Sequence, residues 1–160
     1  MKILFEETQK FKQKWIWILL VGLFIFSITM PFLAFFQNPN FQISKTFITG
    51  NTLNFIIFIA IFLLFYFLKL STKITSEAIE MQYFPFIKKN VTWNDIESTE
   101  VLDYGFVDGW GIRFGTKYGT VYNVSGSKRL HIKLKNGKHF LIGSQKTEIL
   151  EKILNEIWGQ

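Results

Sequence analysis

The chain has no cysteine among its 160 residues, which excludes a disulfide framework, a thiolate metal site and a cysteine nucleophile. It also lacks the Gly-x-Ser-x-Gly, His-Glu-x-x-His and kinase catalytic-loop patterns of common enzymes. Its two histidines, His131 and His139, are diagonal neighbours on one predicted hairpin face, and no carboxylate is predicted in that strand pair. Two imidazoles alone make a poor metal site. The sequence therefore predicts a non-enzymatic protein without a metal or cofactor.

Glycine is concentrated enough in only one stretch, "DGWGIRFGTK" (residues 108–117), to raise the question of a phosphate-binding loop. A dinucleotide fingerprint requires G-x-G-x-x-G before a helix. Here the third glycine, Gly115, comes one position late, and strand-like residues follow it. The order Gly115-Thr116-Lys117 is also wrong for a P-loop. The stretch therefore predicts a turn into a β-strand, with Trp110 either on the rim of the fold or at a membrane interface.

Apolar and charged residues are divided unevenly along the chain. Fourteen of the nineteen phenylalanines lie in residues 1–70, whereas twenty-two of the thirty charged residues lie in residues 71–160. The first part has the composition of a membrane segment, and the second is long enough to form a small soluble domain with its own core.

Two uncharged runs predict transmembrane helices. Residues 15–36 would form a helix of about 33 Å, enough for a hydrocarbon core of about 30 Å. The second run, at about residues 48–68, is of similar length, although Asn51 and Asn54 weaken its start. Two buried core helices are the alternative interpretation.

Lysine counts predict the orientation of these helices. Residues 1–14 carry four lysines, the loop 37–50 carries one, and two follow the second helix. By the positive-inside rule both termini face the cytoplasm. We therefore expect a multi-pass protein of the cytoplasmic (inner) membrane, with a juxtamembrane tail (1–14), a helical region with an external loop (15–70) and a cytoplasmic domain (71–160).

The C-terminal part is rich in β-branched and aromatic residues, with turn signals about every ten residues. In the segment "VTWNDIE" we expect a turn that buries Trp93 and Ile96. Seven strands are predicted, at 72–76, 78–83, 97–104, 111–116, 120–124, 129–135 and 138–142.

The turn "KNGK" allows two hairpin registers. A two-residue loop pairs Leu134 with His139 and mixes polar and apolar side chains on each face. A three-residue loop with Gly137 left-handed pairs Ile132 with Phe140 and gathers the apolar residues on one face. We predict the second register, which leaves His131, His139 and Lys133 on the solvent face.

Residues after Ser144, a candidate cap, carry apolar side chains at helical spacing from Ile149 to Trp158. We expect this amphipathic helix to cover an open end of the sheet, with lipid headgroups as the alternative contact.

This layout resembles bacterial pleckstrin-homology-like (PH-like) domains, and the whole chain resembles small bacterial membrane proteins with two transmembrane helices followed by such a domain. The resemblance is carried by "FEETQKFKQKW", "ITSEAIE…YFPF…VTWNDIE", "GWGIR", "YNVSGSKRLHIKLKNGKHFLIGSQK" and the terminal helix. It implies an α+β domain of about seven antiparallel strands in a barrel or sandwich plus one helix. The first hairpin carries Glu77 and Glu80 where eukaryotic relatives place basic ligands, so inositide binding is not implied.

Charge within the domain is also divided. Residues 109–147 carry eight basic residues and no acid, whereas residues 74–108 carry two basic and seven acidic residues. We predict either a solvated face or a contact with anionic lipid headgroups. The expected function is a membrane-anchored binding or scaffold module for anionic lipid or a protein, and the alternative is an accessory or sensor subunit of a membrane complex. Self-association is open, and nucleic-acid binding is not expected. The candidate contact residues are Arg113, Lys117, Lys128, Arg129, Lys133, Lys135 and Lys138.

Overall fold

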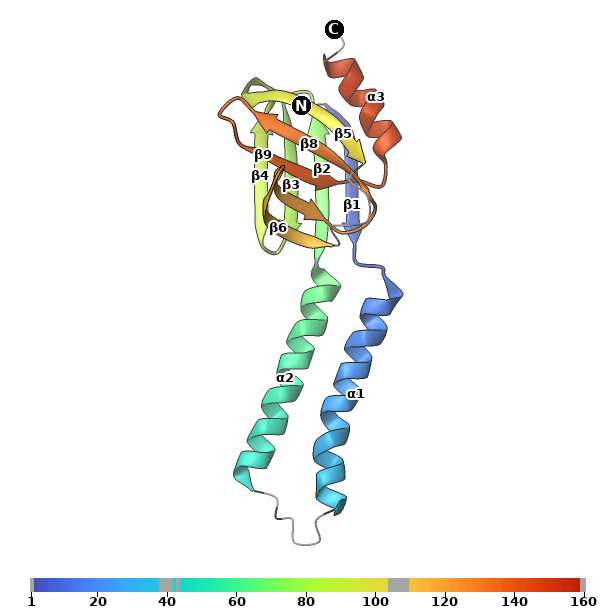
Figure 1. Cartoon of the computed structure of the whole chain (residues 1–160), viewed down its shortest axis with the longest axis vertical. Helices are drawn as coiled ribbons and strands as arrows, with labels where there is room; N and C mark the ends of the chain where they lie inside the picture. The colour runs from blue at the N-terminus through green and yellow to red at the C-terminus, as the bar shows by residue number, and fades with distance from the viewer. Residues whose placement is uncertain (1, 38–41, 43, 104–109, 159–160) are drawn as a thin grey trace. The chain divides into compact units, whose positions relative to one another are not determined.

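The structure, a computed structural model, describes residues 2–37, 42, 44–103 and 110–158. It divides the chain into two compact units (Figure 1). One is a helical hairpin, Lys12–Phe67. The other, which we call the sheet unit, combines Met1–Phe11 with Leu68–Gln160. The hairpin is therefore inserted into the sheet unit near its N-terminus and does not simply precede it.

The hairpin consists of helices α1 (Lys14–Gln37) and α2 (Lys45–Phe67), which pack antiparallel. Trp17 stacks on Phe62 with ring centroids 6.4 Å apart, and Phe24 meets the aromatic rings of α2 one to two turns further along. Both helices are long and apolar enough to cross a membrane. None of the residues of α2 is buried, so the alternative of two buried core helices does not describe this fold.

Helix α2 begins three residues earlier than predicted. Its first turn is held by Ser44, whose hydroxyl accepts the N–H of Phe47 at 3.1 Å. Asn51, one of the two residues expected to weaken this end, donates instead to the backbone carbonyl of Phe47 in the preceding turn at 2.8 Å. Such internal bonds satisfy polar side chains within an apolar helix.

The first sheet has the strand order β1-β2-β3-β4, formed by β1 (Ile3–Lys10), β2 (Lys69–Thr75), β3 (Ala78–Phe84) and β4 (Ile87–Thr92). All neighbours are antiparallel. Residues 1–14, predicted as a tail, therefore contain an edge strand of this sheet. Its inward positions are Phe5, Glu7 and Gln9, and because two of these three are polar the strand shows no alternation of hydrophobicity.

Strand β4 was also missed by the sequence analysis. It forms the opposite edge of the first sheet, and its side chains alternate between half-buried and exposed without a fully buried residue. Lys88 and Lys89 lie on this edge, where lysines discourage pairing with other chains. Edge strands need only a weak apolar face, which explains the missing signal.

The second sheet has the order β5-β8-β9-β7-β6. Its strands are β5 (Ile96–Asp103), β6 (Gly111–Thr116), β7 (Gly119–Asn123), β8 (Lys128–Leu134) and β9 (His139–Gly143). The chain reverses direction from β7 to β8 and again from β8 to β9, so the neighbouring strands β7 and β9 are parallel. We predicted a barrel or sandwich of about seven antiparallel strands; the described strands instead form a four-stranded and a five-stranded sheet that do not close into a barrel, and one neighbouring pair is parallel.

The core of the sheet unit lies between these sheets, whose strands cross in Figure 1. The ring of Tyr83 on β3 lies 6.4 Å from that of Tyr122 on β7, which joins the two layers. The hairpin β8–β9 has the predicted register, with Ile132 opposite Phe140. Gly137 has φ +80°, so the three-residue bulged loop is confirmed.

Helix α3 (Thr147–Trp158) packs against β1, β5 and β8 (Figure 1). Leu150 and Leu154 are buried in this contact, so the predicted covering of the sheet is confirmed. The expected turn is a short 3-10 helix, η1 (Trp93–Asp95), followed by the buried Ile96. Trp93 is only half-buried, and its indole N–H donates to the carbonyl of Thr75 at 2.9 Å.

Candidate anion-contact surface

The seven predicted contact residues do not form one surface. Arg113 lies on β6 and Lys117 in the turn between β6 and β7, while Lys128 and Lys133 lie near opposite ends of β8. A seven-residue strand is about 20 Å long, so these two lysines are well separated. Only Lys133, Lys135 and Lys138 share one end of the β8–β9 hairpin.

Arg129 is buried, with 1% of its surface exposed, so its predicted position outside the core is wrong. It pairs with Leu102 on β5 and Gly143 on β9, and β8 is a central strand of the second sheet. The alternation of charged and apolar residues in "KRLHIKL" suggested a strand with one wet face. In the structure, both faces of this strand are covered near Arg129.

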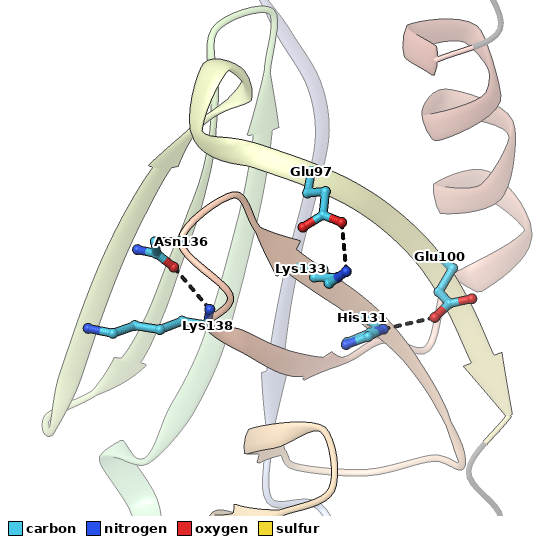
Figure 2. Close-up of polar contacts among 6 residues, drawn as sticks. All are labelled: Glu97, Glu100, His131, Lys133, Asn136 and Lys138. Atoms are coloured by element: carbon cyan, nitrogen blue, oxygen red, sulfur yellow. Dashed lines mark hydrogen bonds and ion pairs between the residues drawn. The ribbon is translucent and has the colours of Figure 1, made fainter.

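Lys133 is only partly exposed, and its charge is paired with a carboxylate. Its ammonium lies 2.6 Å from a carboxylate oxygen of Glu97 on β5, as Figure 2 shows. Both side chains are about half exposed, so the pair contributes little to stability. It nevertheless offsets the charge of Lys133. It also explains part of the acidic cluster that precedes the basic run, because acidic residues of β5 lie beside basic residues of the neighbouring strand β8.

His131 was predicted on the solvent face, and this prediction is wrong. Only 7% of its surface is exposed, and its Nδ1 lies 2.8 Å from a carboxylate oxygen of Glu100 (Figure 2). The ring of Tyr118, in the turn between β6 and β7, makes a T-shaped contact with it at 5.3 Å between centroids. His139 lies 5.7 Å from His131 between ring centroids. Among the described residues no three potential ligands gather around a metal position.

A cation outside the predicted set lies beside the β8–β9 hairpin. Lys89 on β4 places its ammonium 4.3 Å from the ring centroid of Phe140 and 5.3 Å from that of Tyr122. Burial, and secondly the charge of nearby Lys138, lowers the pKa of Lys89. No carboxylate within the described ranges forms an ion pair with Lys89 or Lys138. Lys89 lies in the acidic half of the sequence, so charge counting could not associate it with the hairpin.

We call Lys89, Lys135 and Lys138 the hairpin cations. Lys135 and Lys138 flank the loop that joins β8 to β9, and the backbone N–H of Lys138 is held by the side-chain oxygen of Asn136 at 3.0 Å (Figure 2). Two ammonium groups held close enough to repel each other are suited to an anion, which would relieve that repulsion. The arrangement offers positive charge and cation–π support at one loop.

The glycine-rich stretch confirms the turn-and-strand prediction where the structure describes it. Gly111 has φ +106° at the start of β6, a conformation that favours glycine. Trp110, immediately before it, is half-buried. Asp108 and Gly109 lie outside the described residues.

The fold and surface together define a class of protein: a unit of two β-sheets that is interrupted after its first strand by an apolar helical hairpin. Cations lie at the loop between β8 and β9. Comparisons of the chain with protein-family models, with curated proteins and with solved structures found no match.

Proposed function

We propose that this chain is a non-enzymatic binding module anchored in the cytoplasmic membrane, with α1 and α2 crossing the bilayer and the sheet unit at the cytoplasmic surface. The length and apolar composition of both helices support the crossing. Helices that are apolar on all sides are suited to lipid, because exposing them to water is unfavourable and no protein core covers α2.

Strand pairing supports a same-side arrangement of the two hairpin ends. Lys10 at the end of β1 is the direct partner of Lys69 at the start of β2. Three residues join β1 to α1, and one residue joins α2 to β2. Both helix ends must therefore lie on the same side of any membrane that the hairpin crosses. The lysines near these ends, against the single Lys45 in the loop region, favour the cytoplasmic side.

The hairpin cations carry the proposal that the ligand is anionic lipid. Lys89 lies opposite Met81, three positions along β3 from Phe84, which is paired with Lys69. Three strand residues span roughly 10 Å, about one Debye length at 0.1 M salt. Lys89, with Lys138 nearby, is thus close to the level at which the chain passes to α2, whereas Lys135, whose N–H donates to the carbonyl of Asp95, lies toward the other end of β4. Each basic residue near anionic headgroups contributes about 1 kcal/mol. An acidic protein partner, with the chain as an accessory or sensor subunit, is the alternative.

The orientation is tested by single cysteines in this cysteine-free chain. An impermeant thiol reagent on intact cells should label a cysteine at Gln42, between the helices, and should reach one at Asn155 on α3 only after permeabilisation. Labelling of Asn155 on intact cells would contradict the cytoplasmic assignment.

The lipid contact is tested on the full chain in vesicles. A fluorophore on Asn90→Cys, beside Lys89, should transfer more energy to a headgroup acceptor in phosphatidylglycerol vesicles than in phosphatidylcholine vesicles. Salt should weaken this difference. Replacing the three hairpin cations by glutamate should abolish it, whereas the charge-matched control Lys128→Glu, Lys146→Glu, Lys152→Glu should retain it. Equal transfer in both lipids would leave the cations as a solvated face, and one stoichiometric protein captured from detergent extracts would then favour the subunit alternative.

A further inference from the structure

An exposed aromatic turn joins β3 to β4. Phe84 and Phe86 have 38% and 59% of their surface exposed, and Pro85 lies between them. The N–H of Phe86 donates to the carbonyl of Tyr83 at 2.8 Å, so the turn is closed and holds its rings outward from a defined strand end. Removing a phenylalanine side chain from water is favourable. Two neighbouring rings left in water at one turn therefore point to a surface that covers them.

The strand register places this turn beside the route of the chain into the helical hairpin. Phe84 is the direct cross-strand partner of Lys69, and the ammonium of Lys69 lies 5.8 Å from the centroid of the Phe84 ring. Adjacent strands are about 5 Å apart. Leu68 alone separates Lys69 from the last residue of α2. The aromatic turn is thus tied by covalent and hydrogen bonds to the end of α2, whatever the angle between the two units.

The ends of both apolar helices carry exposed amphipathic aromatics. Trp15 at the start of α1 is half exposed, and Tyr66 at the end of α2 is more than half exposed. Tryptophan and tyrosine gather where a helix leaves the hydrocarbon core, because their rings suit a half-wet position. These residues therefore indicate where the chain passes through the headgroup layer. For α2, that point lies within a few residues of Lys69.

We propose that the Phe84–Phe86 turn inserts into the headgroup–acyl boundary of the leaflet from which α1 and α2 emerge. The occupant of this apolar surface is lipid. The proposal rests on the membrane crossing proposed above, but not on the hairpin cations. With the two chain passages beside Lys10 and Lys69 it gives the first sheet a third point of attachment. Lys10, Lys69 and Phe84 are successive cross-strand partners at one end of the first sheet, so the insertion lengthens the attached row from β1 and β2 to β3. A longer row resists tilting of that end of the sheet toward or away from the leaflet.

The test uses the full chain in lipid vesicles with one spin label at a time. Labels are placed at Phe86→Cys in the turn, at Ile57→Cys within α2 as the lipid reference, and at Ser76→Cys in the exposed β2–β3 turn as the aqueous reference. Oxygen concentrates in lipid and a nickel chelate in water. The ratio of oxygen to nickel collision rates at Phe86 should exceed the ratio at Ser76 and approach that at Ile57. High salt should not reduce it, because apolar insertion is not screened.

Each other outcome overturns the proposal in a distinguishable way. If Phe86 matches Ser76 while Ile57 reports lipid, the turn is in water and only the membrane crossing stands. If Phe86 and Ile57 both report water, the crossing fails together with the insertion. If Phe86 is shielded from both reagents, a protein surface covers the turn in place of lipid.

Discussion

The buried carboxylate of Glu7 ties the N-terminal strand to the C-terminal helix. One of its oxygens accepts the hydroxyl of Ser144 at 2.6 Å, and the other accepts the N–H of Gln145 at 2.9 Å. The Ser144 hydroxyl in turn accepts the N–H of Lys146, just before α3 begins. Glu7→Ala removes two hydrogen bonds to a charged acceptor and leaves a buried hydroxyl without its acceptor. We expect a loss of about 2–4 kcal/mol of unfolding free energy.

Glu6 provides a matched control, since it is exposed on the same strand and carries the same charge. Glu6→Ala should change stability by no more than about 0.5 kcal/mol. Hydrogen exchange on the full chain in micelles gives a local measurement as well as a global one. Glu7→Ala should speed exchange of the α3 amides, residues 147–158, and Glu6→Ala should not. Equal exchange in the two variants would refute the claim that this carboxylate holds α3 on the sheet unit.

Three further predictions follow from the sheets. Replacing residues 11–68 by Asn-Gly should give a soluble, cooperatively melting sheet unit, because the strand ends that it joins are direct partners, whereas residues 71–160 alone lack β1 and should not melt cooperatively. In thermal melts of the full chain, Phe140→Ala should cost about 3–5 kcal/mol as a core truncation, and His139→Ala no more than about 1 kcal/mol; the reverse order would contradict the hairpin register. Burial raises the pKa of Tyr83 to about 12, so the folded chain holds this proton more tightly than the unfolded chain, whose tyrosine pKa is about 10. Stability that is complete below about pH 10 should therefore fall between about pH 10 and 12; Tyr83→Phe should reduce that fall, and an unchanged alkaline profile would count against the buried hydroxyl.

The sequence was informative where local pattern and burial agree. The apolar helices follow from long uncharged runs, and the β8–β9 hairpin follows from Asn136-Gly137 with Ile132 and Phe140 at matching distances. These signals are local, so no knowledge of the rest of the fold is needed. The same holds for α3, whose apolar stripe is regular.

Local pattern failed where polar residues face inward or where distant segments meet. Glu7 on β1 and Arg129 on β8 are buried because tertiary neighbours surround them, and their residue types suggest the opposite. The neighbours β7 and β9 are parallel because the intervening segment β8 runs the opposite way, and the periodicity of the sequence does not record which strands become neighbours in the sheet. Lys89 joins the hairpin cations only because the two sheets face each other.

The pairing of Lys10 with Lys69 has a consequence for how the protein is made. Strand β1 is synthesised before α1, α2 and β2, and β2 is its neighbour among the described strands, so this pairing must wait until both helices have been made. In a free chain, closing a loop of this length would cost roughly 4 kcal/mol of entropy. Two helices already packed side by side bring the strand ends together and remove most of that cost. The hairpin thus acts on the sheet unit as a cross-link would, and conditions that separate α1 from α2 should also loosen the edge strand β1.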